Sequence, residues 1–88
     1  MKTINTRKSF DKALRRLVRS NPRIRPRMEE RINLFIENKD NPILRNHSLV
    51  GNMKGYFSFS ITGDIRIIYE ETPKEIVFVD IGRHSQVY

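Results

Sequence analysis

The sequence predicts an α+β fold in which an N-terminal helical hairpin packs on a small antiparallel β-sheet. Two observations carry this prediction. Apolar residues recur at three- and four-residue steps in the first half of the chain and at two-residue steps in the second half. Amphipathic helices need a surface for their apolar stripes, and a sheet with one apolar face provides it. With 88 residues there is room for one hydrophobic core, so we expect a single domain over residues 1–88.

The first half is expected to form a short strand and two helices. Polar and apolar residues alternate over residues 3–6, although only weakly, and we expect a short first strand there with Ile4 as its core residue. Pro26 leaves two starts open for the second helix, which begins either at Pro22 with an irregular first turn or near Pro26 itself. The turn-forming residues 38–42 end it. The expected apolar stripes are Phe10, Ala13, Leu14, Leu17 and Val18 in the first helix, and Ile24, Met28, Ile32, Phe35 and Ile36 in the second.

The second half is expected to form an antiparallel meander. Apolar residues alternate with polar ones around Phe57 and Phe59, residues 62–64 form a tight turn, and residues 65–70 and 75–81 are β-rich runs. We expect core or sheet-edge positions for Tyr56 and Tyr69, and backbone turns at Gly51, Gly55 and Gly82.

Positive charge is concentrated in the first half of the chain. The net charge is +7, and residues 1–46 carry 13 of the 17 Lys and Arg residues but 5 of the 10 Asp and Glu residues. Lys12, Arg15 and Arg19 lie on the polar face of the first predicted helix, together with Lys8. Such a stripe is either a solvated face or a binding surface for a polyanion such as RNA.

Several classes of protein are disfavoured by composition. Without cysteine there is no disulfide framework, thiolate metal site or cysteine nucleophile, and with two histidines we expect no metal site and no cofactor. No apolar run approaches the roughly 20 residues that span a bilayer. The start of the chain has no apolar segment typical of a secretion signal, so we expect a cytoplasmic protein.

His47 and His84 are the residues best suited to move protons near neutral pH. Both are expected in connecting segments, where scaffolds often place reactive groups. On the residues alone, each is either a catalytic group or an ordinary surface histidine. Asp64 is likewise either a functional carboxylate or a turn former.

Three segments resemble the YafQ-like branch of the RelE/ParE toxin superfamily. Residues 46–56 are similar to a His-x-Leu-x-Gly-x-x-Lys-Gly-Tyr motif, and residues 63–69 to a following Asp and a strand ending in Ile-Tyr. Residues 82–88 resemble the closing segment of these toxins, in which an aromatic residue follows a histidine by four positions. The predicted helical hairpin also fits toxins of the RelE type.

The resemblance implies a ribonuclease that cleaves messenger RNA on the ribosome without a metal ion, by attack of a ribose 2′-hydroxyl, and that a cognate antitoxin silences. It implies His84 as general acid, with the general base left open between His47 and Asp64. Arg66 and Arg83 would hold the scissile phosphate. The other expected substrate contacts are Tyr88, which would stack on a base, Lys54, which otherwise only protects the sheet edge, and Lys12, Arg15 and Arg19.

Three positions depart from the family pattern. Ser60 stands where these toxins have a further histidine, Ile65 where they have a tryptophan, and Asp80 where they have an arginine. In this interpretation Arg66 or Arg83 replaces the arginine that is missing at position 80, while Asp80 would pair with a neighbouring arginine. Two alternatives stay open: a ParE-like inhibitor that binds DNA gyrase without catalysis, and a degenerate toxin that acts only as the antitoxin's partner.

Overall fold

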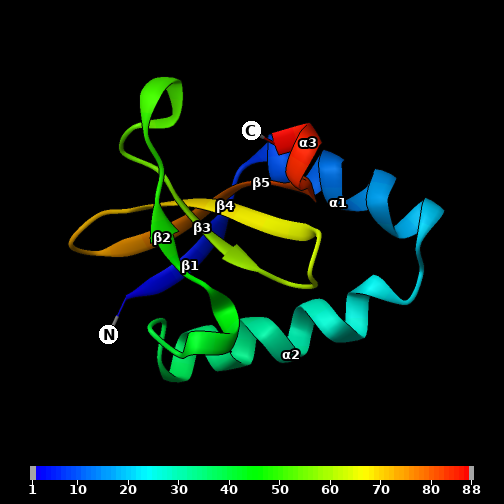
Figure 1. Cartoon of the computed structure of the whole chain (residues 1–88), viewed down its shortest axis with the longest axis horizontal. Helices are drawn as coiled ribbons and strands as arrows, with labels where there is room; N and C mark the ends of the chain where they lie inside the picture. The colour runs from blue at the N-terminus through cyan, green and yellow to red at the C-terminus, as the bar shows by residue number, and fades with distance from the viewer. Residues whose placement is uncertain (1, 88) are drawn as a thin grey trace.

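The structure is a computed structural model that describes residues 2–87, without the side chain of Gln86. Residues 2–87 form three α-helices and five strands, and the strands make one sheet in the order β1-β5-β4-β3-β2 (Figure 1). In chain order the elements are β1 Thr3–Thr6, α1 Lys8–Ser20, α2 Ile24–Glu37, the 3-10 turn η1 Pro42–Leu44, β2 His47–Ser48, the 3-10 turn η2 Gly51–Met53, β3 Phe57–Ser60, β4 Ile65–Glu71, β5 Glu75–Arg83 and α3 His84–Val87.

The predicted α+β fold is confirmed, but the sheet is mixed and not fully antiparallel. Strands β2 to β5 pair antiparallel with their neighbours. β1 runs parallel to β5, with Thr3 opposite Glu75 and Thr6 opposite Phe78. Parallel strands require a long crossover connection. The two helices and the rest of the sheet lie between β1 and β5 in the chain, which provides that connection.

One face of the sheet holds the main core, against which α1 and α2 bury their apolar stripes as predicted. The ring of Phe35 stacks on that of Phe59 with centroids 4.4 Å apart and meets Tyr69 edge-on at 5.0 Å. The prediction that Ile36 belongs to this stripe is wrong, because its side chain is 57% exposed. Leu34 packs against the core from the same helical turn.

The second helix begins between the two predicted starts, after a turn at residues 22–23. α2 begins at Ile24, two residues before Pro26. The amide of Asn21 donates to Leu17 O at 2.8 Å, so Asn21 ends α1 and does not cap α2. Pro26 occupies the third helical position, where an amide would have no acceptor within the helix, and the proline therefore costs no hydrogen bond.

The opposite face of the sheet, called here the open face, is covered only in part. Val87 of α3 packs there on Ile68 and Val79, with Leu49 and Tyr56 from the segment around η2 packed beside them. Ser58 and Ser60, expected on a polar face, are also buried. α3 and the η2 segment thus leave the middle of this face to polar side chains.

The connecting segments are more regular than expected. His47 lies in the two-residue strand β2 and His84 begins α3, so neither lies in an irregular loop. Gly51 and Gly55 adopt φ of 65° and 96°, which confirms their backbone role, whereas Gly82 lies inside β5 and not at a turn. Within residues 2–87, no helix has the length and apolar character needed to cross a membrane.

Candidate functional site

An ion pair joins the β3–β4 turn to the end of β5. Arg83 Nη1 donates to Asp64 Oδ2 at 2.7 Å, and the backbone amide of His84 donates to Asp64 O at 3.0 Å. The pairing of Ile65 with Arg83 across β4 and β5 places these residues side by side. Asp64, Arg83 and His84, far apart in sequence, therefore form one cluster at this end of the sheet.

The carboxylate of Asp64 is held in its ionised form. The hydrogen bond from Arg83 is the largest influence and lowers the pKa of Asp64 below its ordinary value, against a smaller opposing effect of burial. Thr62 Oγ1 accepts from the amides of Asp64 and Ile65 at 3.2 and 3.0 Å, so the turn itself is fixed. A carboxylate with a lowered pKa is a weaker base, which favours an orienting role for Asp64.

Arg66 lies on the open face beside this cluster. Its register partners are Ser60 on β3 and Gly82 on β5. Arg66 Nη1 donates to Ser60 Oγ at 2.7 Å, while its Nε is buried and has no hydrogen-bond partner among the described residues. No carboxylate in the described part of the chain pairs with Arg66, so its charge is available to an anion. Ser60, a departure from the family pattern, serves here to hold this guanidinium.

His47 lies on the same face, on the edge strand β2. It pairs with Ser58, which pairs in turn with Ile68, so its side chain shares their face. His47 Nδ1 lies 2.9 Å from Arg45 O, and because a carbonyl oxygen only accepts, Nδ1 must carry a proton. In a neutral imidazole, Nε2 then has the free lone pair.

The start of β2 is fixed by a partly buried hydrogen bond. Tyr69 Oη donates to Asn46 Oδ1 at 2.8 Å, and burial raises the pKa of Tyr69 to about 12, with a smaller lowering by the Asn46 bond. Tyr69 is thus the core aromatic that was expected, with a polar function added. It holds the residue that precedes His47.

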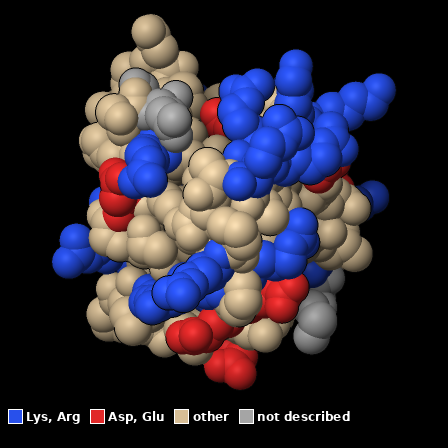
Figure 2. All heavy atoms as spheres, turned by 90° about the vertical axis from the view of Figure 1, so that its right-hand side faces the viewer, with Lys and Arg blue, Asp and Glu red and all other residues tan. Residues whose placement is uncertain are grey.

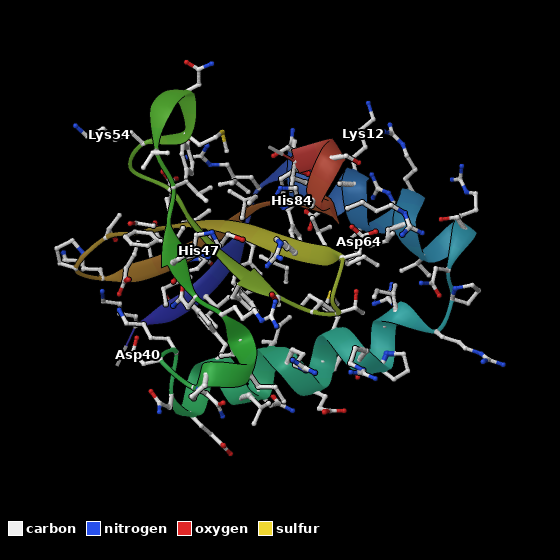
Figure 3. The ribbon with its side chains drawn as sticks, viewed as in Figure 1. Lys12, Asp40, His47, Lys54, Asp64 and His84 are labelled. Carbon is white, nitrogen blue, oxygen red and sulfur yellow. The ribbon has the colours of Figure 1, made fainter. Side chains whose placement is uncertain are left out.

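The predicted catalytic residues share neither one point nor one face, because Arg66 and His47 lie on the open face while Arg83, paired with a core residue of β4, lies on the side of α1. Asp64, Arg83 and His84 are in contact, and Arg66 is next to them in register. His47 lies two strands from Arg66, and ideal sheet spacings put their Cα atoms roughly 12 Å apart. In Figure 3, His84 lies between His47 and Asp64 in the middle of the view. A substrate that reaches both histidines has to lie across the open face.

The predicted substrate-binding residues are dispersed. Lys54 follows η2 and points outward on the left of Figure 3, while Lys12 lies on α1 in the right half of the view. Lys12, Arg15 and Arg19 are exposed along α1 and make no ion pair within residues 2–87. Lys54 and the α1 cations therefore come from two separate elements and form no single cluster. Tyr88 lies outside the described residues.

The other two departures are structural. Ile65 is 3% exposed and belongs to the main core. Asp80 Oδ1 accepts from the amide of Ile81 at 2.9 Å. Asp80 makes no ion pair in residues 2–87, so the expected pairing with an arginine is wrong. Instead it lines a hollow of about 350 Å³ between α1 and β5, together with Arg16 and Arg83.

Sequence reasoning missed a second set of cations. Arg27 and Arg31 of α2 and Arg45 after η1 line a hollow of about 620 Å³ that also includes Ser60 and residues 62–63. The signal was present, since four arginines occur between residues 23 and 31. Their convergence with Arg45 depends on tertiary structure and could not be read from the sequence. Among the described residues, no group of three or more His, Cys, Asp or Glu side chains could hold a metal ion.

One family model matches nearly the whole chain, and several solved structures share the fold. The family model described as "Bacterial toxin of type II toxin-antitoxin system, YafQ" matches residues 2–88. The crystal structure of YafQ from E. coli strain BL21(DE3) superposes with a TM-score of 0.83 at 21% identity, covering 100% of this chain and 99% of that chain. YafQ in the E. coli DinJ–YafQ toxin–antitoxin complex gives 0.81 at 22% identity, with coverage of 99% and 97%.

A metal-bound toxin from Helicobacter pylori gives a TM-score of 0.75 at 28% identity and covers 100% of both chains. A search of curated protein sequences finds no match.

Proposed function

Because this chain belongs to the YafQ family of bacterial toxins from type II toxin–antitoxin systems, we propose that it is an endoribonuclease that cleaves messenger RNA on the ribosome. The observation that supports this proposal is the gathering of Arg66, Arg83 and His84 at one end of the sheet, with Arg66 and His47 on its open face. Proton-transfer groups and cations are what cleavage of a phosphodiester by its own 2′-hydroxyl requires.

His47 is the better general base. Its Nδ1 donates to Arg45 O, so the lone pair of Nε2 can accept the proton of the ribose 2′-hydroxyl. The 2′-oxygen then attacks phosphorus, and the bond from phosphorus to the 5′-oxygen breaks. Asp64 is the weaker candidate because its pKa is lowered and its carboxylate is engaged by Arg83.

The cations act on the charge that develops on the phosphorane. Arg66 brings an unneutralised guanidinium with one buried donor still unused, whereas the charge of Arg83 is offset by Asp64. Hydrogen-bond donors placed where charge develops are worth typically 10² to 10³ in rate each. Arg66 is therefore the principal electrostatic group in this proposal.

His84 donates the proton that the leaving 5′-oxygen needs. Its backbone is fixed by the bond to Asp64 O at the start of α3. The products are a 2′,3′-cyclic phosphate and a 5′-hydroxyl. The proton that His47 takes from the 2′-hydroxyl is matched by the proton that His84 gives to the 5′-oxygen. Every step uses side chains of this chain, so we propose a mechanism without a metal ion.

A cognate antitoxin is proposed as the regulatory partner. In the E. coli complex, a protein of this fold is bound by an antitoxin. The cations without ion pairs on α1 offer such a partner an electrostatic attraction that should weaken as salt is raised.

The test is cleavage of a defined message on purified ribosomes. We expect 2′,3′-cyclic phosphate ends with the wild type, a loss of at least about 100-fold with His84→Ala, and none when the cleaved nucleotide is 2′-deoxy. Intact messages, or full activity of His84→Ala, would contradict the proposal. A gyrase supercoiling assay tests the ParE-like alternative, which predicts inhibition of gyrase without RNA cleavage. If the protein is inactive in both assays, only the role as the antitoxin's partner remains.

A further inference from the structure

We infer that the hollow lined by Arg27, Arg31 and Arg45 binds the backbone phosphates of single-stranded RNA next to the scissile bond. This inference rests on the proposed ribonuclease function and adds a second contact to its substrate. The hollow lies between α2, η1 and the β3–β4 turn, and none of the predicted site residues lines it.

The charge of the hollow is uncompensated. Its lining includes three arginines and no acidic residue. None of the three makes an ion pair with a carboxylate in residues 2–87. Like charges that converge without a counterion repel one another, so an anion in the hollow would relieve an unfavourable interaction.

One donor in this set is already desolvated. Arg31 Nη1 donates to Ile43 O at 3.2 Å, which ties α2 to η1. Arg31 Nε is buried and has no hydrogen-bond partner among the described residues. A buried donor without an acceptor costs about 1–3 kcal/mol, and guanidinium groups match phosphate oxygens with two parallel bonds. Phosphate is thus the anion that these donors suit best.

The hollow is continuous with the candidate site. Ser60 belongs to its lining and also accepts the hydrogen bond from Arg66. Thr62 and Gly63 line it and directly precede Asp64. A phosphodiester held by Arg66 on the open face would therefore have its neighbouring phosphate at the entrance of the hollow.

RNA fits this surface better than an acidic peptide does. Arginine clusters can bind acidic peptide motifs as well as phosphates, but the hollow shares Ser60 with the candidate site, which favours the RNA that this site would cleave. Here the one large apolar side chain in the lining is Ile43, which is 51% exposed and offers a flat contact for a ribose or base. Figure 2 shows Lys and Arg gathered in two groups on the neighbouring end of the molecule, one at the level of α1 and one at the level of α2. An extended polyanion such as RNA can contact both groups of cations.

The test compares two double variants of equal charge. Arg27→Gln/Arg45→Gln empties the hollow of two cations, and Arg23→Gln/Arg25→Gln removes two exposed cations from the adjacent chain outside it. Binding is measured by fluorescence anisotropy on a 2′-O-methyl RNA oligonucleotide, which lacks the attacking hydroxyl and stays intact. We expect the hollow variant to bind at least about 10-fold more weakly and to lower the salt slope by about 1.4, since each phosphate contact contributes about 0.7.

Equal effects of the two double variants would overturn the inference, as would a wild type that does not bind the oligonucleotide at low salt. Weaker binding of the antitoxin with unchanged RNA binding would overturn it too, because the hollow would then belong to the antitoxin interface. Thermal unfolding checks folding, and the single variant Arg27→Gln repeats the test without altering Arg45, whose φ is 49°. If the wild type cleaves messages but the hollow variant binds RNA normally, this inference is refuted and the proposed ribonuclease function stands.

If RNA binding depends on the hollow but the wild type cleaves no message, the ribonuclease function is refuted and the RNA-binding hollow stands.

Discussion

Replacing Arg66 by glutamine should abolish most catalysis while leaving the fold intact. The guanidinium makes one hydrogen bond, from Nη1 to Ser60 Oγ at 2.7 Å, and its buried Nε is unsatisfied. Loss of the bond costs about 0.5–1.5 kcal/mol, and removal of the buried unpaired donor returns about 1–3 kcal/mol. The free energy of unfolding should therefore stay unchanged or rise slightly. The rate should fall by about 10² to 10³, because the cation that faces the phosphorane is lost.

The matched variant is Arg83→Gln, which removes a cation already offset by Asp64. Its rate should fall less than that of Arg66→Gln. Single-turnover cleavage of a ribosome-bound message measures both rates, and urea unfolding measures both stabilities. If Arg66→Gln retains its rate but loses several kcal/mol of stability, Arg66 is a structural residue and the electrostatic assignment is wrong. If Arg83→Gln has the larger effect, the two arginines have been assigned in the wrong order.

Four further predictions follow from other contacts in the molecule. His47→Gln should lower the cleavage rate by about 10² to 10⁴ and Asp64→Asn by less than about 10-fold; the reverse order in single-turnover kinetics would make Asp64 the base. The ion pair of Asp64 with Arg83 stabilises the fold at pH values above the ordinary pKa of an aspartate, and this contribution is lost as pH falls through the lowered pKa of Asp64. In Asp64→Asn, the free energy of unfolding should therefore depend less on pH in the acid range. Tyr69→Phe should lose about 1 kcal/mol with the bond to Asn46 and remove from the ultraviolet titration the group with a pKa of about 12. Loss of a group that titrates near the ordinary tyrosine pKa of about 10 would instead show that Tyr69 is not buried. Phe59→Ala, at a position that is 0% exposed, should cost about 3–5 kcal/mol in urea unfolding, and a cost below about 1 kcal/mol would contradict the packing described.

Much of the fold could be predicted from the sequence because the two halves of the chain have different hydrophobic periods. The stripe from Phe10 to Val18 and the alternation around Phe59 correspond to buried faces. β2 was missed because a two-residue strand has no period, and it exists only through its pairing with β3. The parallel partner of β1 was missed for a similar reason, since strand order depends on tertiary packing.

The candidate site was predictable in its residues but not in its geometry. A resemblance could point to His47, Asp64 and His84, yet nothing in the sequence shows that Asp64 is engaged by Arg83. That contact changes the interpretation of Asp64 from a base to an orienting group. The cations of the hollow were invisible for the same reason, because Arg31 and Arg45 converge only in the folded chain.

The geometry of the site depends on one irregularity in β5. Ile68 pairs with Asp80 and Tyr69 pairs with Phe78, so Val79 is a bulge without a partner on β4. Side chains alternate between faces along a strand, and one extra residue therefore exchanges the faces of everything beyond it. Without the bulge, Asp80 would point into the core and Ile81 out of it. The bulge is held from both sides, because Ser9 Oγ of α1 donates to Val79 O at 2.6 Å and the Val79 side chain packs on α3. Contacts with α1 and α3 thus support the register that sets Gly82 beside Arg66 and Arg83 beside the Asp64 turn, and we expect the site to form only when both helices are packed on β5.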